Sequence, residues 1–77
     1  MNDTDETNYQ VYVDPEGRGP CTVQVRDGAK WAFEYKEDAV ALARKSRAGN
    51  PNSHYLVHEV YDREPRKVVF RTKEEEA

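Results

Sequence analysis

Apolar and polar positions alternate in three short stretches of the N-terminal half of the chain. In residues 9–13, Tyr9, Val11 and Val13 alternate with Gln10 and Tyr12. A period of two is typical of a strand with one buried face. Residues 21–26 and 29–35 repeat the pattern, and residues 14–20, with two prolines and two glycines, separate the first stretch from the second. The first half therefore predicts three strands.

The turn between the second and third strands sets which side chains face each other. Asp27 and Gly28 form a dipeptide that is typical of hairpins. A two-residue turn there would place Gln24 opposite Trp31 and would mix apolar and polar residues on one face. A three-residue loop over residues 26–28, with Gly28 at positive φ, keeps the apolar residues on one face. We therefore expect these pairs: Val25 with Ala29, Val23 with Trp31, and Cys21 with Phe33.

One helix is predicted over residues 37–48. Acidic residues begin it and basic residues end it, which suits the helix dipole at both ends. Gly49 then serves as the C-terminal cap, and Pro51 prevents continuation. The start lacks a good capping residue, because Lys36 stands where Ser, Thr or Asp would be expected. One face carries small residues at helical spacing, which indicates close packing against a sheet: Ala39, Leu42, Ala43 and Ser46.

Two more strands are predicted over residues 54–61 and 67–72. Leu56 and Val60 lie on one face of the first, and Tyr55, Val57 and Tyr61 on the other, so both faces carry apolar residues. This pattern is typical of central strands, or of a sheet whose second face is covered by a partner. The predicted fold is α+β: an antiparallel sheet in the order β-β-β-α-β-β with one helix packed on one face. We expect a single domain over residues 9–72.

Composition favours a small, charged protein that needs a partner for stability. Of 77 residues, 36% are hydrophobic and 35% are charged, so the core is thin. The single Cys21 permits no internal disulfide and suits a reducing, cytoplasmic compartment. Oligomerisation is then the remaining common source of stability, so we expect a homodimer. No run approaches the ~20 apolar residues of a membrane span, and the polar, acidic start differs from a secretory signal peptide.

The negative charge lies at the two ends of the chain. Residues 1–8 carry −3 and residues 73–77 carry −2, whereas the region between them carries +2, which together give the net charge of −3. Short acidic ends of this kind are typically solubilising and disordered. We therefore expect a disordered acidic head over residues 1–8 and a disordered acidic tail over residues 73–77.

The arrangement resembles small β-β-β-α-β-β proteins of unknown function from bacteria and their phages. The similarity rests on an aromatic strand that leads into a helix beginning Glu37-Asp38-Ala39, with Ala43 one turn later, followed by a strand such as residues 55–58. It covers roughly residues 9–71. The resemblance implies the same fold and, since the activity of those proteins is unassigned, no functional residue.

Catalytic and metal-binding patterns are not evident. Cys21 is in phase with Val23 and Val25, which favours a buried structural thiol over a nucleophile. His54 and His58 are four residues apart, a spacing that spans ~13 Å on a strand and is too wide for one zinc ion. Glu59 is expected to be exposed. We therefore predict no enzyme activity, no metal and no cofactor.

The surface supports three hypotheses. The first is a protein-interaction module, a bacterial or phage accessory or inhibitor protein, because five tyrosines and one tryptophan are many for this length and these residues are enriched at interfaces. The candidate contacts are Tyr12, Tyr55 and Tyr61. The second is nucleic-acid binding, although a pI near 5.3 and the acidic ends oppose it. The candidate contacts are the basic residues of the helix end and the last hairpin: Arg44, Lys45, Arg47, Arg63, Arg66, Lys67 and Arg71. The third is a small-ligand-binding protein.

Overall fold

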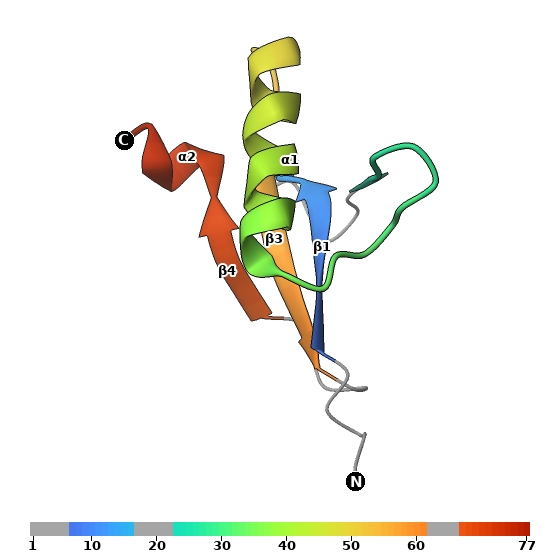
Figure 1. The fold of residues 1–77 in the computed structure, drawn as a ribbon. Coiled ribbons are helices and arrows are strands. Elements are labelled where there is room, and N and C mark those ends of the chain that lie inside the picture. The colour runs from blue at the N-terminus through green and yellow to red at the C-terminus, as the bar shows by residue number, and fades with distance from the viewer. Residues whose placement is uncertain (1–6, 17–22, 62–66) are drawn as a thin grey trace, which may run out of the picture.

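Four antiparallel strands form one sheet, and a single long helix lies against it (Figure 1). The computed structural model describes residues 7–16, 23–61 and 67–77. The elements are β1 (Thr7–Val13), β2 (Gln24–Val25), α1 (Lys36–Gly49), β3 (Tyr55–Tyr61), β4 (Lys67–Arg71) and α2 (Thr72–Glu75). The order of the strands in the sheet is β2-β1-β3-β4. This arrangement confirms the predicted α+β class with one helix on one face.

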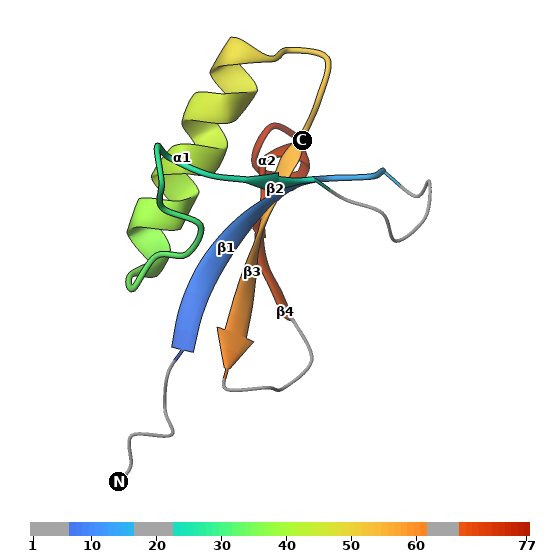
Figure 2. The ribbon, with the colours of Figure 1, turned by 90° about the vertical axis from the view of Figure 1, so that its right-hand side faces the viewer.

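The core lies between α1 and the face of the sheet that carries the odd-numbered residues of β1 and β3. Val11 and Val57 are opposite each other in the register and are fully buried. The predicted small-sided face of α1 is confirmed: Ala39, Leu42 and Ala43 are buried against this sheet face. Two alanines on that face let the helix approach the two central strands closely. Figure 2 shows α1 on one side of the sheet and none of the described helices covering β1 and β3 on the other.

The segment between β2 and α1 does not form the third strand that the sequence predicts. Asp27 and Lys30 form an isolated two-residue hairpin, with Asp27 N–H donating to Lys30 O at 3.1 Å and Lys30 N–H donating to Asp27 O at 3.0 Å. Gly28 has φ of 63°, as a turn of this kind requires. The three-residue loop is therefore wrong, and so is the pairing of Val25 with Ala29, because Val25 pairs with Val11 of β1.

The chain returns to the sheet at Phe33. Its N–H donates to Tyr9 O at 2.9 Å, and Tyr9 N–H donates to Phe33 O at 2.8 Å. Val25 and Phe33 thus contact the same edge of β1, and residues 26–32 leave that edge between them. We call these residues the edge excursion. The predicted partner of Phe33, Cys21, lies outside the described residues. The reason for the difference is that β1 and β2 both offer partners to the backbone N–H and C=O of Phe33, and these groups bond to Tyr9 of β1 instead of continuing the hairpin with β2.

Helix α1 is one residue longer at each end than the predicted range of 37–48. Tyr35 is its N-cap and makes no side-chain capping bond, which agrees with the weak start predicted from Lys36. Gly49 belongs to the helix, and Asn50 follows as the C-cap with its N–H donating to Arg47 O at 3.2 Å. Gly49 is therefore not the cap that the sequence predicts.

The end of the chain is ordered as the short helix α2, where the sequence predicts a disordered tail from residue 73. Thr72 is 1% exposed, and its hydroxyl oxygen accepts the Tyr55 N–H at 2.9 Å. Arg44 Nε donates to Glu75 at 2.8 Å, and Arg47 donates to both carboxylate oxygens of Glu76, at 2.9 and 3.0 Å. The tail differs from the prediction because its glutamates find partners on α1, which a sequence pattern does not reveal.

Candidate partner-binding surface

Two of the three tyrosines predicted to bind a partner are buried. Tyr55 is 5% exposed and belongs to the core beneath α1. Tyr12 is also 5% exposed, on the other face of the sheet, where its ring lies 4.8 Å from that of His58 and its hydroxyl donates to Gln10 Oε1 at 2.6 Å. Tyr61, at the end of β3, is 43% exposed. Only Tyr61 of the three offers a partner much surface.

The larger exposed aromatic surface is at the β2 edge of the sheet, where sequence reasoning did not place it. Trp31 is 46% exposed, and Val23 and Tyr35 are more exposed still. The Arg26 guanidinium lies 4.7 Å from the centre of the Trp31 ring, and Gln24 Nε2 donates to Trp31 O at 3.0 Å. We call three residues of this edge and of the excursion the Trp31 edge: Val23, Arg26 and Trp31.

The sequence missed Trp31 because alternation puts it in phase with Phe33, which is buried. The two side chains separate only because the chain meets β1 at Phe33 and stays away from it through the edge excursion. No local pattern distinguishes the two aromatics. The Asp27-Gly28 dipeptide correctly predicts a turn, and a turn here is a signal that residues 29–32 can leave the sheet.

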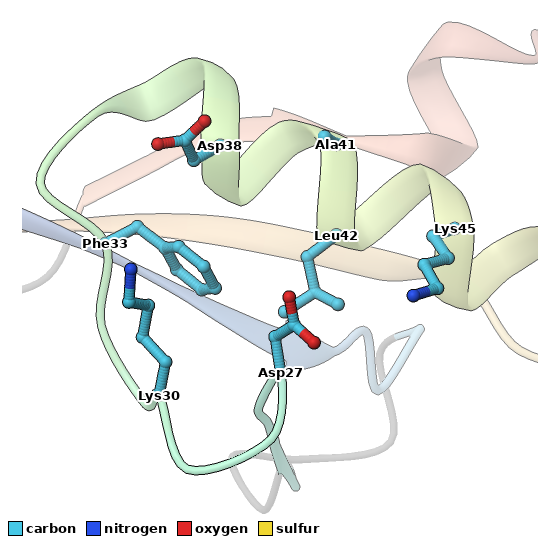
Figure 3. Close-up of a pocket in the computed structure, with 7 residues that line it drawn as sticks. All are labelled: Asp27, Lys30, Phe33, Asp38, Ala41, Leu42 and Lys45. Carbon is cyan, nitrogen blue, oxygen red and sulfur yellow. The ribbon is translucent and has the colours of Figure 1, made fainter.

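A groove lies between the edge excursion and α1 (Figure 3). Its volume is about 420 Å³. Phe33 and Leu42 give it an apolar floor, and Figure 3 shows the charged rim formed by residues of both walls: Asp27 and Lys30 from the turn, and Asp38 and Lys45 from the helix. Lys30 Nζ lies 5.6 Å from the Phe33 ring centre. The groove therefore has an apolar floor surrounded by charges of both signs, and the edge excursion forms one of its walls.

Of the cations proposed for nucleic acid, the five that the structure describes are not gathered into one free cluster. Arg44 and Arg47 are on the side of α1 that contacts α2 and are paired with its glutamates. Lys45 lines the groove instead. Lys67 and Arg71 stand at the two ends of β4, and Arg63 and Arg66 lie outside the described residues.

The side chains considered for chemistry are held in structural contacts or lie outside the described chain. Cys21 is outside it. His54 Nδ1 lies 3.1 Å from Thr72 Oγ1, and His58 is against Tyr12 on the other face of the sheet. Over residues 7–16, 23–61 and 67–77, no three His, Cys, Asp or Glu side chains come together as a metal site.

Glu59 is half-buried rather than exposed, and it is bonded to a neighbouring strand. It lies opposite Tyr9 in the register of β1 and β3, and the Tyr9 hydroxyl donates to Glu59 Oε2 at 3.0 Å. This hydrogen bond is the main cause that raises the pKa of Tyr9 above its ordinary value of 10.0, and burial and the negative charge of Glu59 add to it. The contact stabilises the neutral phenol and joins the two central strands.

Replacing Glu59 by glutamine is expected to lower the pKa of Tyr9 towards 10.0, because the carboxylate charge is lost and the bond is weakened. Since the folded pKa lies above the unfolded value, the contact stabilises the fold below pH 10, and its contribution is lost as the pH rises through the folded pKa. NMR titration of the tyrosine ring signals measures the shift, with Tyr9→Phe to assign the signal. Identical Tyr9 titration in wild type and E59Q would contradict this account.

Within the part of the chain that the structure describes, helices are too short and too polar to cross a bilayer. Comparison with known proteins adds no assignment: no family model, no characterised protein and no solved structure matches this chain.

Proposed function

We propose that this chain is a non-catalytic protein-interaction module of the cytoplasm that binds a partner protein through the Trp31 edge. The observation that supports it most is the half-exposed Trp31, whose ring lies 4.7 Å from the Arg26 guanidinium and whose backbone oxygen accepts a hydrogen bond from Gln24. Tryptophan and arginine are the residues most enriched among those that dominate binding energy at interfaces. The large, rigid indole has few rotatable bonds to immobilise, so it loses little conformational entropy on binding.

The surroundings of Trp31 also suit a protein partner. Val23, the neighbour of Gln24 in the chain, is also exposed, and Asp27 and Lys30 of the edge excursion line the groove beside α1, which has an apolar floor and a charged rim. An apolar centre with a polar rim is the usual arrangement of a protein interface. The partner in this proposal is therefore a folded protein or a peptide segment, and the adjoining charges would fix its orientation.

Trp31→Ala is expected to reduce recovery of the partner at least about tenfold in affinity capture from the source cells, since it removes a central contact. The matched control is Tyr61→Ala, which removes an aromatic residue of similar exposure from the far end of β3. A protein recovered by wild type and Y61A, and lost with W31A, supports the proposal. Equal recovery by W31A and wild type would refute it, and loss with Y61A alone would move the surface to Tyr61.

The chain itself is a second proposed partner, because a thin core and an exposed aromatic edge both favour self-association. Light scattering should then give twice the 8.9 kDa of one chain for the wild type. A mass of 8.9 kDa at micromolar concentration would rule the homodimer out and leave the Trp31 edge to another protein.

A further inference from the structure

We draw no further inference here: the strongest candidate, the groove between the edge excursion and α1, adjoins the surface already proposed for a partner, and nothing in the structure shows what fills it.

Discussion

Replacing Phe33 by alanine is expected to lower the free energy of unfolding by about 3–5 kcal/mol, which is among the largest effects available in this domain. Phe33 is 6% exposed, is part of the core cluster with Leu42 and Val11, and is the residue at which the chain rejoins β1. A domain of this size has a total stability of only ~4–12 kcal/mol. Urea unfolding followed by circular dichroism should therefore show a variant that is partly or largely unfolded in water.

The informative control lies two residues away. Trp31→Ala removes a larger side chain from the same alternating stretch, yet it should cost only about 1–1.5 kcal/mol, because the indole is half exposed, lies outside the core cluster and loses a contact with Arg26. A regular third strand would bury both aromatics and make the two costs similar. Comparable losses for F33A and W31A would thus contradict the edge excursion.

The second large loss of stability is expected on substitution of Thr72, because its side-chain hydroxyl, rather than a backbone oxygen, accepts the N–H of Tyr55 in β3. Its oxygen accepts the Tyr55 N–H at 2.9 Å and lies 3.3 Å from Tyr55 O. Thr72→Val keeps the shape and leaves that buried N–H unpaired, which should cost about 1–3 kcal/mol. Hydrogen exchange of the Tyr55 amide, followed by NMR, should be much faster in this variant.

Thr72→Ser separates the hydroxyl from the methyl group. Serine retains the oxygen that accepts the Tyr55 N–H, so protection of that amide should be kept, while the lost methyl group costs about 0.8 kcal/mol. If the Tyr55 amide exchanges at the same rate in T72V and T72S, the Thr72 hydroxyl is not the partner that protects it.

The parts of the fold that the sequence predicts well are those controlled by local periodicity. Alternation in residues 9–13 correctly indicated β1, apolar residues on both faces of residues 54–61 correctly indicated β3, and the small face of α1 was correctly identified by Ala39 and Ala43. These patterns suffice because the spacing of apolar residues along a strand or a helix depends on that element alone. The α+β fold class follows from these strand and helix patterns.

The errors arise where two segments compete for the same backbone partner or where ion pairs form across the chain. Residues 29–35 alternate as a strand should, but Phe33 pairs with Tyr9 and the neighbouring positions remain outside the sheet. The acidic end has the composition of a disordered tail, but Glu75 and Glu76 meet arginines 31 and 29 residues earlier. Neither outcome is encoded within a short window of sequence.

The candidate surface was less predictable than the fold for the same reason. Whether a tyrosine is a core residue or a contact residue depends on what covers each face of the sheet. Tyr12 and Tyr55, on opposite faces, are both buried, and Trp31 is not. Composition correctly drew attention to the aromatic residues, but it did not indicate which of them face solvent.

The edge excursion has an evolutionary consequence. Val25 and Phe33 fix its two ends to β1, so the loop next to Gly28 can gain residues without changing the strand pairing on either side. Related chains can therefore differ in length and sequence there while keeping the same scaffold, and a foreign peptide epitope inserted at this position is expected to be displayed on an unaltered sheet.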